Sequence, residues 1–544
     1  MKLKSLSLLV IGGGILFSLF LQGQVADGVY FSGDGGLKAL LAKQLASGEL
    51  RFDLAIPDLP WVQELWNAGL YPYDEPYVYQ VADKYYITFP YTFPLVTAPF
   101  YALFGYRGLY IVPLVSCWVI WLVFYWDCLR LKLNDWVSAV GLICLIFGSY
   151  LTIYSAMYWE HTLAVALSFS GLSLWFLSHK NGKYSLIKTI FSGILIGLAV
   201  WFRPEFVCVV IIMMGLAFVA ITYPWWRNFF EAKQIQPILF SLLQQLVLII
   251  SMISTVIGFF VTNKIIYGYA VGIHGIQVVE SVAISDRLIG AWSNFTGMSL
   301  ALVEYFPVIL FPLFYLALYL FQKLFFRQYN LKFSILETLA YLAIISFIIG
   351  VSLLVPVGTS GLISGGKQWG VRFLLMVIPV VTMLIIVQLQ QLVKYKISKY
   401  VAIFLLVFLG VISINKNVVH STQVLTKNNQ VTAPAVEYLK SDPNQYIAIS
   451  HEFAGQTLEA ATIDREIFFT IDTVPELLNF SQELIEEKQN EFTYICYPHR
   501  ACNLPKALPK DLQFTNNNKQ YQIQFKKQAN LGKYPIYQGT IISK

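Results

Sequence analysis

Runs of roughly 20 apolar residues, the length that crosses a bilayer as a helix, recur along most of this chain. Short polar segments separate them. The pattern predicts eleven membrane-spanning helices, at 6–21, 109–125, 136–157, 162–177, 186–202, 206–223, 237–261, 300–321, 339–357, 373–390 and 400–414. Only 13% of the residues are charged, about half the share in a soluble domain. The predicted fold class is mainly α, a polytopic transmembrane helical bundle.

The orientation of the bundle follows from the positions of Lys and Arg. With the N-terminus inside, the inner segments hold fifteen of these residues and the short outer loops hold five. Inner loops are enriched in Lys and Arg, so we expect a cytoplasmic N-terminus and an extracytoplasmic C-terminal segment in a multi-pass protein of the plasma membrane. The net charge of +7 is spread over the inner loops and calls for no nucleic-acid partner. The first run is expected to be retained, because Ala26-Asp27-Gly28 is a poor signal-peptide cleavage site.

The first outer loop, 22–108, is predicted to contain interfacial helices. One begins near Leu37, because the apolar residues Leu37, Leu40, Leu41 and Leu45 share a helical face. A helix packed on soluble protein is the alternative, but the loop is too short to hold a core of its own. The segment 89–105 contains three prolines, which disfavour a regular spanning helix. It is predicted to be a second interfacial or re-entrant segment that ends at Gly105.

The chain divides into a membrane domain, 1–415, and a small outer α/β domain, 416–544, whose residues are more polar. Strands are predicted at 445–450, 465–471, 491–497, 520–525 and 535–542, with a helix at 474–488. Cys496 and Cys502 lie six positions apart in this domain, where an oxidising compartment favours a disulfide. A zinc site with His499 is the alternative, although no fourth ligand is apparent.

Ionisable residues gather at the outer ends of the predicted spans, where such groups are usually functional. They are Asp34, Glu160, His161, Arg203, Glu205, Lys367 and Arg372, and the outer loop 262–299 adds His274. Each has a structural alternative. Arg203 and Glu205 can form a local ion pair, Glu160 can cap a helix, and Asp34 can be the N-cap of a helix at 35–46. Taken together, they indicate one polar cavity at the membrane surface.

This mixture of charges suits glycosyl transfer from a lipid-phosphate sugar. Cations at headgroup depth bind a phosphate, and a nearby acid takes the proton from an acceptor hydroxyl. Asp34, on a glycine-rich hinge, is the predicted base, with Glu160 and Glu205 as further catalytic candidates. The predicted substrate-binding residues are His161, Arg203, His274, Lys367, Trp369 and Arg372.

These segments resemble those of the GT-C membrane glycosyltransferases, which use polyprenyl-phosphate sugars and include protein mannosyltransferases and the lipid A aminoarabinose transferase. The similar stretches are an acid in the first outer loop, the Pro-rich "FPLVTAPFYALFG", "YWEH", "FRPE" and "GGKQWGVRFLLMVIP". The last carries Trp369, Gly370, Arg372 and Pro379, with Val371 where Pro is common. The resemblance implies a hexosyl or pentosyl transferase that inverts the anomeric centre. It also implies a lipid-linked donor, and an acceptor glycan, lipid or protein at the outer face.

The sequence departs from many members in having one acid in "SGDGG", with Asp27 seven residues before Asp34. A divalent metal held by paired acids is therefore not required by this sequence, and cations can neutralise the phosphate instead. A transporter or lipid flippase is the rival hypothesis. The charges lie at the outer edge rather than mid-membrane, and there are no paired broken helices, so it is less favoured. A non-catalytic scaffold would leave the outer charges unexplained.

Overall fold

The computed structural model describes most of the chain, namely residues 5–178, 185–231, 236–273, 275–276, 284–325, 331, 333–355, 368–394, 396–462, 466–502, 504–507, 512–516 and 519–544. The described chain packs into two compact units, each made of two segments. The first unit contains Met1–Gln22 and Tyr110–Gln423, and the second contains Gly23–Leu109 and Val424–Lys544. The first outer loop thus belongs with the C-terminal segment by packing. The predicted division into a membrane domain, 1–415, and an outer domain, 416–544, stays a prediction.

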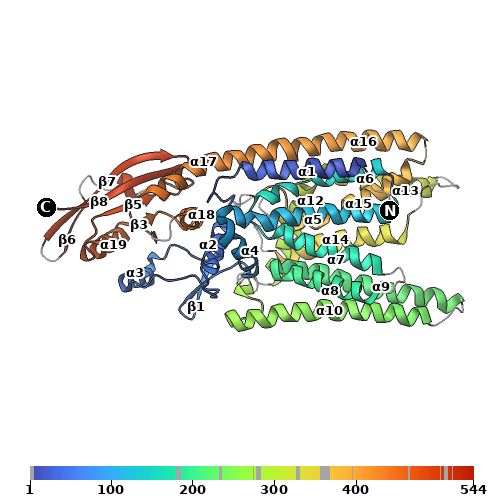
Figure 1. Ribbon diagram of the computed structural model, residues 1–544, viewed down its shortest axis with the longest axis horizontal. Helices are drawn as coiled ribbons and strands as arrows, with labels where there is room; N and C mark the ends of the chain where they lie inside the picture. The colour runs from blue at the N-terminus through green and yellow to red at the C-terminus, as the bar shows by residue number, and fades with distance from the viewer. Residues whose placement is uncertain are drawn as a thin grey trace. The chain divides into compact units, whose positions relative to one another are not determined.

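The first unit is a bundle of long apolar helices that lie side by side (Figure 1). They are α1 (Ser5–Gly23), α5 (Ile111–Arg130), α6 (Asp135–Ile146), α7 (His161–Ser178), α8 (Ser185–Phe202), α9 (Val207–Glu231), α10 (Gln236–Tyr267), α12 (Ile284–Tyr305), α13 (Leu310–Phe325), α14 (Ile335–Leu354), α15 (Val377–Leu392) and α16 (Lys396–Ile414). Short helical turns, η3 (Thr152–Ala156), η4 (Pro204–Phe206), η5 (Pro307–Ile309) and η6 (Arg372–Leu374), lie between some of them.

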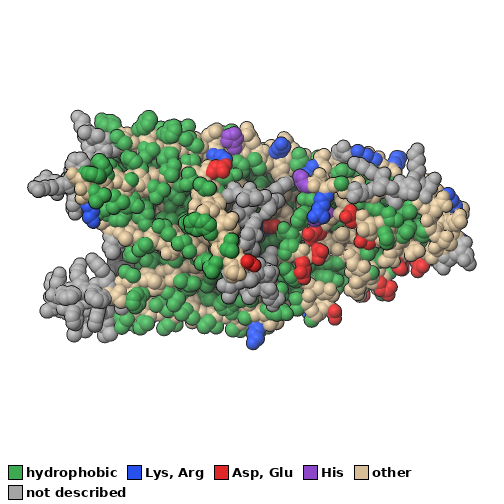
Figure 2. All heavy atoms as spheres, turned by 180° about the vertical axis from the view of Figure 1, so that it is seen from behind, with side chains coloured by type: hydrophobic (Ala, Val, Ile, Leu, Met, Phe, Trp, Pro, Cys, Tyr) green, Lys and Arg blue, Asp and Glu red, His purple; other side chains and the backbone are tan. Residues whose placement is uncertain are grey.

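Seven helical stretches are long and apolar enough to cross a membrane, and four shorter apolar helices lie at 135–146, 161–176, 204–220 and 377–392. Each of the eleven predicted spans overlaps one of these stretches. Large apolar side chains such as Leu9, Leu16 and Phe404 are more than 70% exposed. Figure 2 shows hydrophobic side chains over much of the visible face of the first unit, with few charged ones. Such a surface is suited to lipid, and the mainly α transmembrane fold class is confirmed.

Some predicted boundaries differ from the observed helices. The predicted span 300–321 crosses a break, because α12 ends at Tyr305 and α13 begins at Leu310 after the turn that starts with Pro307. Proline lacks an N–H and begins a new helix more easily than it continues one. The predicted outer loop 262–299 therefore contains most of α12. The predicted span 400–414 is followed by further helix rather than by a helix end. The helix α16 continues through η7 (Asn415–His420) into α17 (Ser421–Ser441).

The second unit combines helices of the first outer loop with a six-stranded sheet. The loop supplies α2 (Gly33–Ala46), α3 (Pro60–Leu65), η1 (Trp66–Leu70), β1 (Val78–Val81), β2 (Lys84–Ile87), α4 (Thr92–Phe104) and η2 (Gly105–Tyr110). The C-terminal segment supplies α17, β3 (Tyr446–Ile449), α18 (Glu452–Leu458), η8 (Glu459–Ala461), β4 (Ile467–Thr470), α19 (Val474–Glu486), β5 (Glu491–Ile495), α20 (Leu504–Ala507), β6 (Leu512–Asn516), β7 (Lys519–Leu531) and β8 (Tyr534–Ser543). The strand order is β4-β3-β5-β8-β7-β6.

The sheet is mixed, because its two halves are connected differently. β3 pairs in parallel with β4 and β5, and the helices α18 and α19 make the crossovers. β5, β8, β7 and β6 pair in antiparallel fashion. The five predicted strands and the predicted helix 474–488 are all present. β6 and the hairpin β1–β2 are strands that the sequence analysis did not predict.

The first outer loop obtains its core from the C-terminal segment. Trp61 and Trp66 are buried against Phe469, and the Trp66 indole donates to the carbonyl of Phe468 at 3.1 Å. In α2, Leu37 and Leu41 are fully buried. The face of α2 that carries Leu37 and Leu41 is therefore packed on protein, as in the alternative given for this helix. No local pattern predicted that the core of this loop lies some 400 residues further along the chain.

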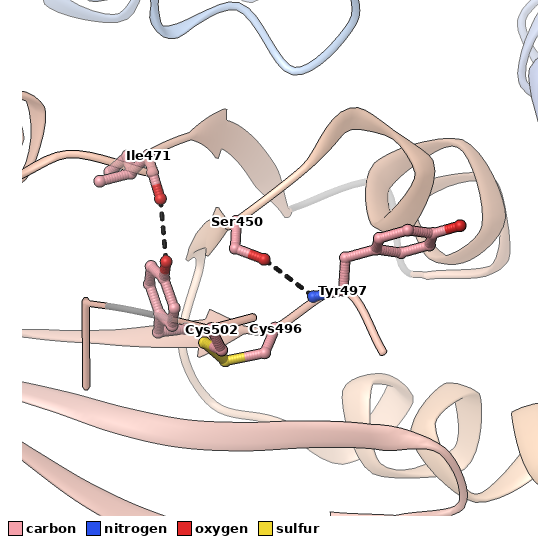
Figure 3. The surroundings of a disulfide bond; sticks show 6 residues. Ser450, Ile471, Cys496, Tyr497 and Cys502 are labelled. Atoms are coloured by element: carbon pink, nitrogen blue, oxygen red, sulfur yellow. Dashed lines mark hydrogen bonds between the residues drawn. A yellow bond between two sulfur atoms is a disulfide. The ribbon is translucent and has the colours of Figure 1, made fainter. Parts of the chain in front are cut away.

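The predicted disulfide between Cys496 and Cys502 is present, at the end of β5 (Figure 3). Tyr497, the residue after Cys496, donates its N–H to Ser450 Oγ at 2.8 Å. The Tyr494 hydroxyl donates to the carbonyl of Ile471 at 2.9 Å. The disulfide thus lies where β5 leaves the parallel half of the sheet, and it excludes the alternative of a zinc site built on both cysteines.

Candidate functional site

Three of the predicted site residues meet in one buried ion-pair cluster of the first unit. Arg203 Nη1 lies 2.9 Å from Glu160 Oε1, and Arg203 Nε donates to Glu205 Oε1 at 2.6 Å. The side chains of Glu160, Arg203 and Glu205 are only 1%, 11% and 7% exposed. Two carboxylates thus surround one guanidinium, and the cluster has one excess negative charge.

The chain brings these residues together at two helix junctions. Glu160 directly precedes α7, and its carbonyl accepts the first helical hydrogen bond, from Ala164 N at 3.1 Å. Arg203 is extended between α8 and η4, where Pro204 occupies the first helical position. The expected local pair of Arg203 and Glu205 is present. The contact to Glu160, 43 residues away, was not predicted.

Arg372 lies beside this cluster, on aromatic rings. Its guanidinium carbon is 5.3 Å from the centre of the Trp159 ring and 5.1 Å from that of Phe373. Arg203 also lies 5.1 Å from the centre of the Phe373 ring. A guanidinium that uses its face on a ring keeps its N–H donors in its own plane for an anion. The structure therefore places two cations at the Phe373 ring, and two carboxylates contact Arg203.

Two phenols hold the segment that carries Arg372. The Tyr154 hydroxyl donates to the carbonyl of Trp369 at 3.0 Å, and the Tyr150 hydroxyl donates to that of Val371 at 3.1 Å. Gly370, between them, has a φ of 69°, and a side chain there would meet the Tyr150 ring at 2.5 Å. Only glycine satisfies both conditions. Arg372 thus belongs to a backbone segment whose course is set by buried hydrogen bonds.

Trp369 is a buried part of the same segment rather than an open surface. Its indole Nε1 donates to Asn417 Oδ1 at 3.3 Å, and its ring meets Tyr305 edge-on at 5.2 Å between centres. Asn417 also donates to the carbonyl of Tyr305 at 2.7 Å. Lys416 pairs with Glu304 at 2.6 Å and lies over the Tyr305 ring. Trp369 is therefore held by Asn417 and Tyr305.

His161, the first residue of α7, is buried among aromatic rings. Its ring centre lies 5.4 Å from that of Trp159 and 5.7 Å from that of Tyr154. Because Trp159 also contacts Arg372, His161 belongs to the same group of side chains as the ion-pair cluster. We call Tyr154, Trp159, Glu160, His161, Arg203, Glu205, Arg372 and Phe373 the arginine cluster.

Asp34 lies in the second unit, in the first turn of α2. The helix begins at Gly33 and its N-cap is Ser32, so the alternative that Asp34 is the N-cap of a helix at 35–46 is wrong. An acid in the first turn is favoured by the helix dipole, which explains why a helix can begin in "SGDGG". Lys38 follows one turn later, is 1% exposed, and has its Nζ 4.3 Å from the centre of the Phe89 ring.

The second unit also contains buried acids that the sequence analysis did not single out. The Tyr73 hydroxyl donates to Glu459, and burial raises the pKa of Glu459 to about 8, although Lys43 opposes the shift. Burial likewise raises the pKa of Glu452 to about 7, although the N–H of Asp74 donates to its Oε2 at 2.9 Å. Both acids belong to the C-terminal segment. Glu452 lies in α18 and Glu459 in η8, the two elements that contact α2.

Two predicted binding residues, His274 and Lys367, lie outside the described residues. Among the residues that the structure describes, no three His, Cys, Asp or Glu side chains form a group that could hold a metal ion. The sequence analysis missed Tyr150 and Tyr154. Their signal was the spacing of tyrosines by four residues, at 150, 154 and 158, directly before "WEH".

Comparison with solved structures shows two that match nearly the whole chain. ArnT from Cupriavidus metallidurans bound to undecaprenyl phosphate is 10% identical, covers 99% of this chain and 98% of its own, and has a TM-score of 0.55. The same protein in the apo state is 11% identical, with coverages of 98% and 97% and a TM-score of 0.51. The Archaeoglobus fulgidus oligosaccharyltransferase tethered with an acceptor peptide is 11% identical, with coverages of 90% and 68% and a TM-score of 0.48.

No family model matches the sequence, and no curated protein matches it significantly. At these identities the likeness concerns the fold. This chain has the fold of ArnT along nearly its whole length, and the resemblance to the GT-C glycosyltransferases is confirmed at that level.

Proposed function

We propose that this chain, which has the fold of ArnT, transfers a sugar from a polyprenyl-phosphate donor to an acceptor hydroxyl at the outer face of the membrane. The observation that carries the proposal is the arginine cluster, in which three chain segments bring two arginines to one aromatic ring and two carboxylates to one of those arginines. An ordinary helix end does not need such an assembly. A site for an anionic headgroup needs a cation such as Arg372.

Arg372 is the cation that we assign to the donor phosphate. Arg203 is already held by Glu160 and Glu205, so its charge is offset within the protein. Arg372 lies over the rings of Trp159 and Phe373, and a guanidinium suits a bidentate bond with phosphate oxygens. In this proposal Arg203 and its carboxylates shape the site, and Arg372 binds the leaving group.

A cavity of about 350 Å³ in the first unit suits the apolar tail of such a donor. Its lining includes Met376 and Val377, which follow Arg372 along the chain, and Val209, which follows Glu205. Phe347 from α14 and Phe169 from α7 form further parts of the wall. A prenyl tail in this cavity would make van der Waals contacts with these apolar side chains, which a soluble sugar phosphate lacks.

The proposed reaction is a single displacement at the anomeric carbon. The bond from the acceptor oxygen to that carbon forms while the bond to the phosphate oxygen breaks, and the configuration inverts. The hydroxyl proton passes to Asp34, and the electron pair leaves with the polyprenyl phosphate, whose charge Arg372 stabilises. Asp34 is the base in this proposal, as the sequence predicts, and Glu160 and Glu205 are ion-paired with Arg203. The donor is a hexosyl or pentosyl phospholipid of the plasma membrane, and the acceptor is a glycan, lipid or protein.

The test uses the purified full chain in lipid nanodiscs with radiolabelled polyprenyl-phosphate hexoses and pentoses. The expected result is donor consumption that yields free polyprenyl phosphate and depends on Arg372. A transporter or flippase would move the labelled lipid between leaflets of a vesicle without cleaving it. Intact donor and rapid leaflet exchange would overturn the proposal.

A further inference from the structure

The helix that carries Asp34 packs on the C-terminal segment through glycines. Within the second unit, α2 contacts α18 and η8 (Figure 1). At Gly36, a side chain would overlap the carbonyl oxygen of Gln456 and lie 2.8 Å from its carbonyl carbon. At Gly33, a side chain would meet the Gln456 side chain, 3.2 Å from its Cβ. The two glycines are therefore points where the helix α2 contacts Gln456, rather than the hinge that the sequence predicted.

The rest of this helix and the segment before it are also held by the C-terminal segment. Ala26 N–H donates to Asn429 Oδ1 at 2.8 Å, and Asn428 Nδ2 donates to the carbonyl of Tyr30 at 3.2 Å. At the far end of α2, Lys43 Nζ donates to the carbonyl of Thr462 at 3.1 Å. Both ends of the stretch 26–43 are therefore attached to residues 428–462.

We propose that α18 sets the position of Asp34 by its close packing against Gly33 and Gly36 of α2, so that the C-terminal segment is a working part of the transferase. This inference rests on the proposed function, because it gives Asp34 the role of base. A bulky contact at Gly33 or Gly36 would move α2 away from α18 and Asp34 with it. Displacement of a reacting group by about 1 Å costs on the order of 100-fold in rate.

The experiment compares substitutions that meet different atoms of the same residue. Gly33→Ala meets the Gln456 side chain, so we expect it to lower kcat about 10- to 100-fold, and we expect Gln456→Ala to restore most of that loss. Gly36→Ala meets the Gln456 backbone, so Gln456→Ala should not restore it. The donor KM should change little in both. Gly12→Ala, a helical glycine with nothing within 4 Å, is the matched control and should behave as wild type.

Hydrogen exchange of the amides at 33–46 gives a second measurement that needs no activity. Both glycine variants should exchange faster than wild type there, and Gln456→Ala should slow exchange again only in Gly33→Ala. Wild-type kcat and exchange in folded Gly36→Ala would overturn the inference. If Gly36→Ala does not fold, the Gly33→Ala variant decides. The inference would be overturned if adding Gln456→Ala left the lowered kcat of Gly33→Ala unchanged.

The two proposals can fail separately. A wild-type chain that transfers no sugar would contradict the proposed function. In that case the exchange measurement alone would decide whether α18 positions the helix of Asp34.

Discussion

Arg203 and Arg372 lie at the same ring, yet their loss should have different consequences. Arg203→Gln would leave Glu160 and Glu205, which are 1% and 7% exposed, buried without their cation. Removing one partner of a buried ion pair costs about 3–5 kcal/mol, because the remaining charge is desolvated and uncompensated. We therefore expect Arg203→Gln to lower the thermal stability of the protein strongly.

Arg372→Gln should instead weaken donor binding while the fold persists. Arg372 lies over the rings of Trp159 and Phe373, and the substitution leaves both rings in place. A charge-assisted hydrogen bond contributes about 1.5–3 kcal/mol, which corresponds to a dissociation constant about 10- to 150-fold higher. Arg107→Gln is the matched control. Its ion pair with Asp27 is half exposed, and such surface pairs contribute little.

The assay measures melting temperature in detergent and the dissociation constant for polyprenyl phosphate on each purified variant. The double variant Arg203→Gln, Glu160→Gln should recover part of the lost stability, since one buried charge is removed with its partner. The assignment would be refuted by a stable Arg203→Gln protein that no longer binds polyprenyl phosphate while Arg372→Gln still binds it.

Three further predictions follow from other parts of the structure. Asp34→Asn keeps the size of the side chain but not its basicity. It should reduce turnover by roughly 100-fold or more with normal folding, and full turnover in the folded variant would reject Asp34 as the base. The pKa of Glu459 is about 8 in the fold and 4.5 in the unfolded chain, so the folded state retains a proton between these values. Stability should therefore fall as the pH rises from about 5 to 8, and thermal melts should show a weaker pH dependence in Glu459→Gln. A reporter fused after residue 415 should be extracytoplasmic, because inner segments hold fifteen of the basic residues counted and outer loops five; a cytoplasmic reporter would contradict the topology.

The periodic and compositional features of the fold were predictable because they are local. A run of roughly 20 apolar residues can satisfy its backbone in lipid only as a helix, wherever the rest of the chain lies. Alternating strands such as 491–497 and 535–542 carry their own signal in the same way. Element ends were less predictable, as the break at Pro307 shows, because a long apolar pattern masks a single turn inside it.

The resemblance to the GT-C glycosyltransferases also came from local stretches, and the fold confirmed it. The identities of Glu160, Arg203, Glu205 and Arg372 as outer charged residues required only the pattern of spans. That these side chains lie next to one another depends on how the helices pack in the bundle. Nothing within the sequence near Arg203 indicated that Glu160, 43 residues earlier, would pair with its guanidinium.

The glycines around Asp34 show the same limit most clearly. A Gly-rich stretch has high intrinsic flexibility, so the sequence by itself predicted a hinge. The tertiary structure decided otherwise, because α18 approaches α2 so closely that only hydrogen fits at Gly36. Local sequence determines which conformations a segment can adopt. Only contact with residues about 420 positions away, such as Gln456, selects one of them, because that contact depends on how the whole chain packs.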